Sequence, residues 1–173
     1  MSTTHTSPTI GENPHPEAKP GAKPDPVAAS GEQVFVTLSL ADQLCGIPVL
    51  MVRDVLSAHT ITRIPLAPAE IAGSLNLRGR IVTAIDLRRR LSLPPAGNGA
   101  KQMAVVTEQG GELYAFLVDQ VAEVLSLRAE DFERNPPTLP AVWAHHSRGI
   151  YRLADRLMVV LDIARLLAFT QAA

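Results

Sequence analysis

Short apolar runs separated by turn residues recur along the chain from residue 33 onward. The first run, Gln33–Leu40, places Val or Leu at every second position, which is the period of a half-buried strand. A turn at Ala41-Asp42-Gln43 then predicts a hairpin with the strand that follows it. Further strands are predicted at Leu44–Pro48, Thr60–Ile64, Ile71–Leu77, Arg80–Ile85, Gln102–Thr107 and Glu112–Val118.

Helical segments are predicted to be few and short. In Val49–Leu56 a valine stands at every third position, which is closer to a helical period than to that of a strand, so one or two helical turns are expected there. Another turn of helix is expected at Ala129–Phe132, because Asn135-Pro136-Pro137 ends it. Short strands at close spacing with little helix predict an all-β fold.

One part of the sequence occurs twice. Gly73–Leu91 and Gly149–Leu167 match at a constant offset of 76 positions. The identical residues in the first copy are Gly73, Leu77, Arg80, Asp86, Arg89 and Leu91. In both copies an apolar run, read as a buried strand, precedes Asp86 or Asp162. The carboxylate of either residue is expected to cap a short helix by accepting its free backbone N–H groups.

A second pair of segments supports the duplication. Val49–Ser57 resembles Val118–Ser126 at an offset of 69, and both contain an acid before Val-Leu-Ser. The change of offset from 69 to 76 predicts a seven-residue insertion around Asn135–Trp143. The chain is therefore predicted to consist of two related halves.

The two copies differ at the end of one predicted strand. Asn76, Arg78 and Gly79 of the first copy are replaced by Arg152, Ala154 and Asp155 in the second. Asn-Leu-Arg-Gly is therefore a candidate for a function that the second copy lacks. The alternative, that Arg78-Gly79 is only a solvated turn, stays open at this point.

The length of 173 residues predicts one domain or two small ones. Residues 1–31 contain six of the fourteen prolines and few large apolar side chains, so they are expected to form a disordered Pro-rich tail. Residues 32–173 are expected to fold as a first barrel, about 32–97, and a second, about 98–173, with 32–95 and 149–173 sharing elements. Halves of this size have marginal cores, so the two barrels should pack together.

Charge and cysteine content narrow the possible environments. The formal net charge of −1 creates no general attraction for nucleic acid or an anionic membrane. The single cysteine, Cys45, lies in an apolar run and is expected to be a buried thiol in a reducing cytoplasm. The N-terminus lacks the apolar core of a signal peptide, and Asp162 and Arg165 interrupt the most apolar C-terminal stretch, so a soluble protein is expected.

Catalytic and cofactor motifs are missing from the sequence, so neither an enzyme nor a metal or cofactor is predicted. Asp86 and Asp162 are interpreted as helix caps rather than as a general acid and base. His145-His146 is not expected to bind a metal, because adjacent side chains on an extended segment point to opposite faces. Nothing near Cys45 would lower its pKa and activate it as a nucleophile.

Arginines 78, 80, 88, 89 and 90 form the only basic cluster in the sequence. No aromatic residue lies between Phe35 and Tyr114 to stack on bases beside them, so a nucleic-acid groove is not favoured. Arg88-Arg89-Arg90 is interpreted as a solvated helix end, where cations interact well with the helix dipole. These observations together predict a binding module.

Several motifs together resemble the CheW family of chemotaxis coupling proteins, over residues 33 to 168. The most specific are Gly73-x-x-Asn76-Leu-Arg-Gly79 and Ile85-Asp-Leu-Arg88. The others are Phe35-x-x-x-x-Leu40, Gly46-Ile-Pro-Val49, Val52-x-Asp54-Val55, Arg63-Ile-Pro65, Leu117-Val-Asp119 and Val121-x-Glu123-Val124-Leu125. Thr83, where a proline is common in the family, and the Pro- and His-rich Asn135–Ser147 depart from this pattern.

The resemblance implies two tandem five-stranded SH3-like barrels with short helices. It also implies a non-enzymatic adaptor, cytoplasmic and recruited to receptor arrays, that bridges the cytoplasmic tip of chemoreceptors to the regulatory domain of the histidine kinase CheA. Neither nucleic-acid binding nor direct membrane insertion is expected. The residues that match binding positions of the family are Val52, Asp54, Val55, Asn76, Arg78 and Gly79 in the first half, and Met103, Leu117 and Val121 in the second.

Two alternatives remain open on the sequence. An adaptor of a non-chemotaxis kinase pathway, such as motility or development, would carry the same motifs. An RNA-binding small barrel would instead predict salt-dependent binding to a generic oligonucleotide.

Overall fold

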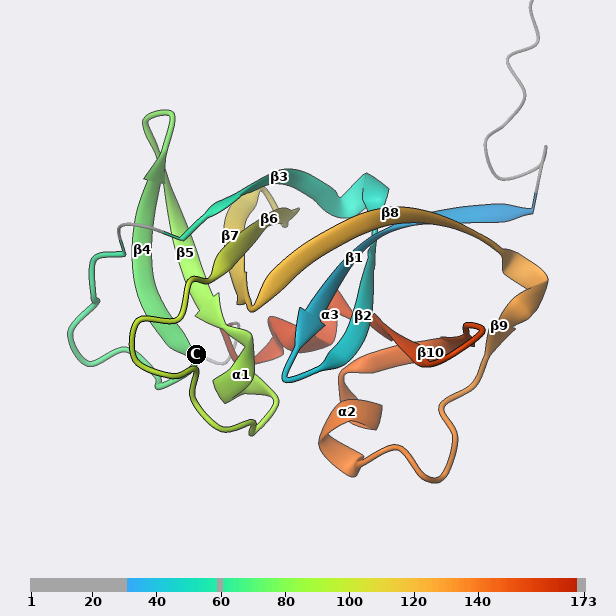
Figure 1. Ribbon diagram of the computed structural model, residues 1–173. Helices are drawn as coiled ribbons and strands as arrows, with labels where there is room; N and C mark the ends of the chain where they lie inside the picture. The colour runs from blue at the N-terminus through green and yellow to red at the C-terminus, as the bar shows by residue number, and fades with distance from the viewer. Residues whose placement is uncertain (1–30, 59–60, 171–173) are drawn as a thin grey trace, which may run out of the picture. The chain divides into compact units, whose positions relative to one another are not determined.

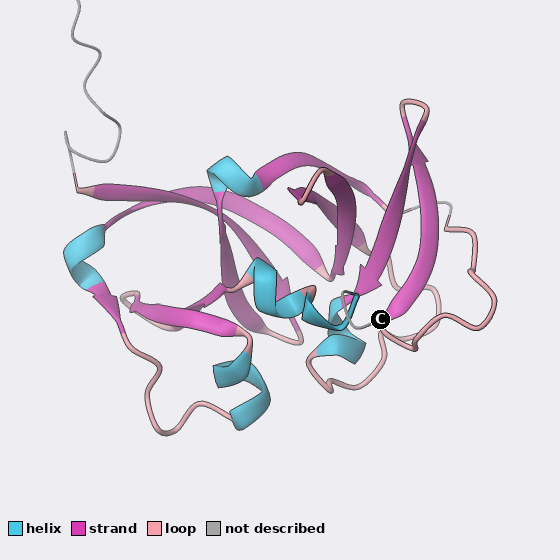
Figure 2. Cartoon of the chain, turned by 180° about the vertical axis from the view of Figure 1, so that it is seen from behind, coloured by secondary structure: helices cyan, strands magenta, loops and turns pink. Residues whose placement is uncertain are grey.

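The computed structural model of the chain describes residues 31–58 and 61–170 (Figure 1). The predicted Pro-rich tail, apart from Gly31, lies outside the described residues. The strands are β1 Glu32–Leu40, β2 Gln43–Pro48, β3 Val52–Ser57, β4 Ile71–Leu77, β5 Arg80–Asp86, β6 Met103–Gln109, β7 Glu112–Val118, β8 Gln120–Arg128, β9 Phe132–Glu133, β10 Ser147–Arg152 and β11 Leu157–Leu161. The helical segments, each about one turn long (Figure 2), are η1 Val49–Met51, α1 Leu87–Arg90, η2 Ala129–Asp131, α2 Ala141–His145, α3 Ile163–Leu166 and η3 Ala168–Thr170.

The strands form two sheets, which confirms the all-β prediction. One sheet has five strands in the order β3-β6-β7-β5-β4, and the other has six in the order β8-β1-β2-β11-β10-β9. The sixth strand, β9, contributes only two residues. The family's pattern of two small sheets packed together is therefore present, with one short strand more than expected.

The predicted boundary between the halves, at residues 97 and 98, does not separate the two sheets. Hairpin β1–β2 belongs to the six-stranded sheet, because β1 pairs with β8 and β2 pairs with β11. Hairpin β6–β7 completes the five-stranded sheet, because β6 pairs with β3 and β7 with β5. A hairpin defines its own two strands locally, whereas its outer partners come from distant segments that the sequence pattern does not identify.

The two sheets repeat one topology. When each is followed from its first strand, β3, β6, β7, β5 and β4 correspond in order to β8, β1, β2, β11 and β10. The isolated bridge between Thr62 and Ser74 corresponds to the pairing of Glu133 with Ile150. The duplication read from the sequence is therefore a duplication of structure.

Both copies need a glycine at the start of the first hairpin strand. Gly73 and Gly149 have φ values of 149° and 157°. A Cβ on Gly73 would collide with the carbonyl oxygen of Thr62, and a Cβ on Gly149 would collide with Phe132 and with the carbonyl oxygen of Glu133. The glycine is retained in both copies because the preceding segment crosses the strand at this point.

The valines spaced three apart mark a β-bulge rather than a helix. Only Val49–Met51 is helical, and the chain continues as β3. In β3 the register against β6 shifts between Val52 and Asp54, and β8 shifts against β1 between positions 121 and 124. An extra residue at a bulge brings side chains three positions apart onto the same face, and this produces a helix-like spacing within a strand.

Other local predictions have mixed outcomes. Asp86 and Asp162 accept the backbone N–H groups of Arg89 and Arg165 at 3.3 and 3.1 Å, which confirms both helix caps. The strand predicted at Thr60–Ile64 is wrong, since in its described part only Thr62 forms a bridge. The remaining predicted hairpins and the turn at residues 129–131 are present.

The largest apolar cluster is shared by the two sheets. It combines side chains of β1 and β2 with side chains of β5, β6 and β7, and includes the helical residues Leu87, Trp143 and Leu166. Each sheet also has a smaller cluster of its own, built around Ala115 in the five-stranded sheet and around Tyr151 in the six-stranded sheet. The two sheets therefore pack on a common core, as their small size predicts.

Candidate functional site

The β4–β5 hairpin carries the Asn-Leu-Arg-Gly motif at its tip. Arg78 and Gly79 both have positive φ values, 52° and 84°, as the central residues of a tight two-residue hairpin turn require. The side-chain oxygen of Asn76 accepts the N–H of Gly79 at 2.9 Å. Asn76 and Gly79 thus build the turn, and the turn leaves the side chain of Arg78 84% exposed.

An ion pair joins this turn to strand β3. Nη2 of Arg78 lies 3.4 Å from Oδ2 of Asp54, while Oδ1 of Asp54 accepts the N–H of Val55 at 2.8 Å. Next to this pair, Arg53 and Glu108 form a second ion pair at 3.4 Å, and the four charged residues line a pocket of about 180 Å³. The predicted residues Asp54 and Arg78, 24 positions apart, therefore lie together.

Three predicted apolar residues lie at the border of the shared core. Val52 of β3, Met103 of β6 and Val121 of β8 are partly buried and pack against the cluster that joins the two sheets. We refer to these three residues as the apolar rim. Val52 and Val121 are equivalent residues of the duplication, and each lies on the edge strand of its sheet, β3 or β8.

Leu117, another of the predicted binding residues, lies inside the five-stranded sheet. Its side chain is only 3% exposed and belongs to the cluster inside the five-stranded sheet. Strand β7 is central in that sheet, between β6 and β5, so a partner cannot reach Leu117 without opening the fold. Val55, by contrast, is half-buried on the edge strand β3, where it is paired with Val105 of β6.

The prediction that Arg88-Arg89-Arg90 is a solvated helix end is wrong for two of the three. Arg88 donates Nε and Nη2 to the two carboxylate oxygens of Asp119 at 2.8 and 2.7 Å. Asp119 also accepts the N–H of Ala41 at 2.8 Å, and the hydrogen bond from Arg88 holds the pKa of Asp119 below its usual value. Each partner stands at the end of a family motif, Ile85-Asp-Leu-Arg88 or Leu117-Val-Asp119, but neither motif shows that the two side chains meet.

Arg90 connects the two copies directly. Its guanidinium donates to the backbone carbonyls of Leu166 and Arg165 at 2.9 and 3.0 Å and lies 4.7 Å from the centre of the Phe169 ring. Arg90 and Leu166 are equivalent residues at the offset of 76. Arg90 therefore joins the end of α1 to the end of α3, the equivalent helix of the second copy.

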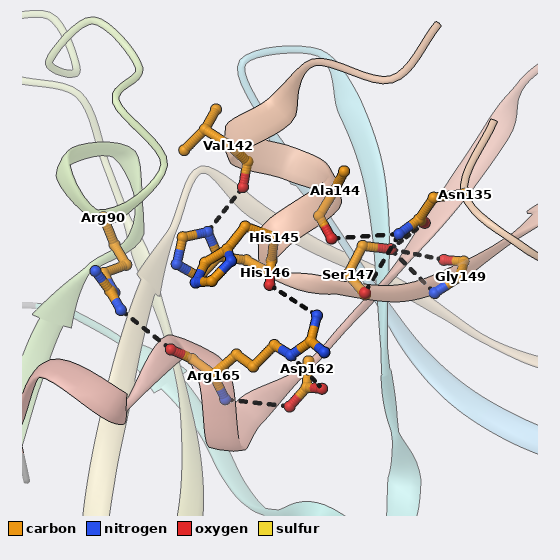
Figure 3. Close-up of polar contacts among 10 residues, drawn as sticks. All are labelled: Arg90, Asn135, Val142, Ala144, His145, His146, Ser147, Gly149, Asp162 and Arg165. Carbon is orange, nitrogen blue, oxygen red and sulfur yellow. Dashed lines mark hydrogen bonds and ion pairs between the residues drawn. The ribbon is translucent and has the colours of Figure 1, made fainter. Parts of the chain in front are cut away.

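The segment around α2, where the second copy is longer than the first, is held by a hydrogen-bond network (Figure 3). His146 contacts the carbonyl of Val142 through Nδ1 at 2.7 Å, and burial lowers its pKa. The rings of His145 and His146 lie 4.8 Å apart and perpendicular, so they do not point to opposite faces as predicted. The reason is that they stand at the end of a helix, not on an extended segment.

Catalytic chemistry receives no support from the described part of the chain. Cys45 is buried, and this burial raises the pKa of its thiol. Within residues 31–58 and 61–170 no three His, Cys, Asp or Glu side chains are grouped to hold a metal ion. In the same residues no helix is long and apolar enough to cross a membrane.

Comparisons with known proteins agree with this architecture. The family model described as the CheW-like domain matches residues 34–171. The chain is 30% identical over 141 residues to a chemotaxis protein CheW of Klebsiella aerogenes, covering 82% of this chain and 85% of the relative. It is 29% identical over 146 residues to that of Treponema pallidum, covering 82% and 86%.

A solved structure shares the fold. The scaffolding protein TtCheW from Thermoanaerobacter tengcongensis superposes with a TM-score of 0.71 at 29% identity, over 78% of this chain and 92% of that one. The family match covers both sheets and all three α-helices, including the Asn-Leu-Arg-Gly turn and the apolar rim. The chain therefore belongs to the CheW-like family of chemotaxis adaptor proteins.

Proposed function

We propose that the chain couples the cytoplasmic tip of chemoreceptors to the regulatory domain of the histidine kinase CheA, as a cytoplasmic, non-enzymatic adaptor recruited to receptor arrays. Family membership supports the adaptor role. The observation that carries the proposal is the apolar rim, where equivalent edge strands of the two sheets bring Val52 and Val121 to the border of one shared core. Apolar side chains left partly exposed at such a border can bind a further apolar surface.

A helical receptor tip suits this border. An amphipathic helix presents apolar residues along one face, and these can pack against Val121 and the rest of the apolar rim. Arg78 then contacts a carboxylate or a backbone carbonyl of the same helix. Its ion pair with Asp54 is exposed and therefore weak, so a partner's carboxylate can share or replace it.

The kinase contact involves the outer sheet edges formed by β3 and β8. Among residues 31–58 and 61–170, no strand pairs with the outer side of β3 or β8, and unpaired edges are sites where another protein can bind. Val55 and Met103 lie near the edge of the five-stranded sheet, while Leu117 contributes only to folding.

The test is a calorimetric titration of the full chain with two partners from the same organism, the CheA regulatory domain and a soluble receptor fragment that contains the tip. Arg78→Glu should weaken receptor binding while the CD spectrum and unfolding midpoint stay close to those of the wild type. Arg156→Glu is the matched control, because Arg156 lies exposed beside the corresponding turn of the second copy.

Different results point to different errors. Unchanged receptor affinity in a folded Arg78→Glu variant would remove Arg78 from the binding surface. Failure to bind any CheA of the organism would assign the chain to a kinase pathway other than chemotaxis. Salt-dependent binding to a generic oligonucleotide would instead favour the RNA-binding alternative.

A further inference from the structure

Two pockets of about 400 Å³ occupy equivalent places in the two copies. Each contains an arginine, Arg63 or Arg134, that directly follows the residue paired with the first hairpin strand, which is Thr62 in one copy and Glu133 in the other. Each also contains a helix-capping aspartate and the arginine three positions after it. The first pocket is lined by Arg63, Ile64, Pro65, Leu66, Ala67, Pro68, Ala69, Ile71, Ala72, Asp86 and Arg89, and the second by Arg134, Asn135, Ser147, Arg148, Asp162 and Arg165.

The second pocket has one arginine more than the first and lacks its aliphatic side chains. Ile71 and Ala72 of the first pocket correspond to Ser147 and Arg148 of the second. The apolar side chains of residues 64–69, which line the first pocket, have no apolar counterpart in the lining of the second. Since alanine serves at the equivalent position of the same fold, the architecture does not require Arg148. The extra charge therefore calls for an explanation other than folding.

Two of the three guanidinium groups in this pocket have no carboxylate partner. Arg165 lies 3.7 Å from Asp162 and donates to the carbonyl of His145 at 3.2 Å. Arg134 and Arg148 are exposed and form no ion pair with any residue in the described part of the chain. The pocket thus presents two uncompensated positive charges beside one compensated pair.

The backbone that carries these arginines is held in place (Figure 3). The hydroxyl of Ser147 donates to Oδ1 of Asn135 at 2.8 Å, and the amide nitrogen of Asn135 donates to the carbonyl of Ala144 at 3.3 Å. Asn135 adjoins Arg134 and Ser147 adjoins Arg148, so the network holds the two backbone segments from which these arginines project. Charged groups on a fixed frame lose less entropy when they bind a ligand.

We propose that this pocket, which we name the arginine pocket, binds the carboxylates of an acidic segment in a partner protein. Guanidinium groups bind carboxylates through two parallel hydrogen bonds, and the pocket offers two such groups on different segments. Asp162 repels a compact multivalent anion placed next to Arg165, whereas separate carboxylates can pair one each with Arg134 and Arg148. The arginine pocket shares no residue with the apolar rim, so this inference does not depend on the proposed receptor contact.

The experiment uses the full chain labelled with ¹⁵N and a hexaglutamate peptide blocked at both ends, titrated at low ionic strength. Saturable chemical-shift changes are expected at Arg134, Arg148 and Arg165. Arg148→Ala should weaken binding by about three- to tenfold, the loss expected for one guanidinium–carboxylate contact. This variant places in the pocket the residue that the equivalent position, Ala72, already has. Arg63→Ala, in the other pocket, is the control and should leave the affinity unchanged.

Three results would overturn the inference. Equal losses in the Arg148→Ala and Arg63→Ala variants would show general attraction to surface charge. Shift changes spread over arginines outside the arginine pocket would show the same. Inorganic phosphate that binds the pocket as tightly as the peptide would show a small-anion site rather than a site for a protein segment. Binding or failure of CheA and the receptor has no bearing on any of these readouts.

Discussion

Arg88 and Asp119 form a two-pronged ion pair, with nitrogen–oxygen distances of 2.8 and 2.7 Å, at the point where the chain passes from β7 to β8. Through Asp119 the pair also reaches the β1–β2 turn at Ala41. The ion pair therefore connects three segments: helix α1, the link between β7 and β8, and the β1–β2 hairpin of the six-stranded sheet. The equivalent positions of the duplication are Ala164 and Leu50, so this connection exists at one junction only.

Loss of one partner of this pair should destabilise the fold. Arg88 and Asp119 have side chains only 16% and 23% exposed, so Arg88→Ala leaves a half-buried carboxylate without its main partner. We expect the free energy of unfolding in urea to fall by about 1–3 kcal/mol. Arg89→Ala, next in sequence but more than half exposed, should change it by less than about 0.5 kcal/mol. Equal effects of the two variants would contradict the role given to Asp119.

The same pair should make stability depend on acid. The folded-state pKa of Asp119 is lowered, chiefly by the hydrogen bond from Arg88. The pair's contribution is therefore fully present above the unfolded-state pKa, about 4, and is lost as pH falls through the lower folded-state value. Urea titrations between pH 7 and pH 3 should show a smaller loss of stability below about pH 4 in Asp119→Asn than in the wild type. An unchanged acid limb would show that Asp119 does not titrate with folding.

Local features of this fold could be predicted from the sequence because their causes are local. The hairpin turns and the Asp86 and Asp162 caps depend on residues within a few positions of one another. The duplication was also visible, because Gly73 and Gly149 are both required where another segment crosses the strand. The hairpin turn at Arg78-Gly79 was predicted correctly because the residues that build it, Asn76 to Gly79, are also close in sequence.

Features that depend on distant partners could not be predicted. The parallel pairings of β2 with β11 and β5 with β7 join segments whose sequences carry no sign of each other. Leu117 belongs to a family motif, yet only the strand order shows that it is enclosed. Arg88 and Arg90 looked solvated because Asp119 and the Leu166 carbonyl come to them only through tertiary packing.

His146 should give stability a second dependence on pH, nearer neutrality. Burial lowers its folded-state pKa, so the folded protein favours the neutral ring. This contribution is complete above the unfolded-state pKa, about 6.5, and is lost progressively as pH falls below it. His146→Asn, which keeps a donor for the carbonyl of Val142, should flatten the stability profile between about pH 7 and pH 5.5. An unchanged slope in the His146→Asn variant would show that His146 does not titrate with folding.

Gly73 should tolerate no side chain, in contrast to Gly79 on the same hairpin. Both have positive φ values, so alanine at either position carries a conformational cost of about 1 kcal/mol. At Gly73 the new Cβ also collides with the carbonyl of Thr62, whereas no heavy atom lies within 4 Å of a Cβ on Gly79. Gly73→Ala should therefore lower the free energy of unfolding by more than about 2 kcal/mol and Gly79→Ala by about 1 kcal/mol, as measured by urea denaturation. Similar losses in the two variants would mean that the segment carrying Thr62 moves aside freely, and the bridge to Ser74 would then contribute little to the fold.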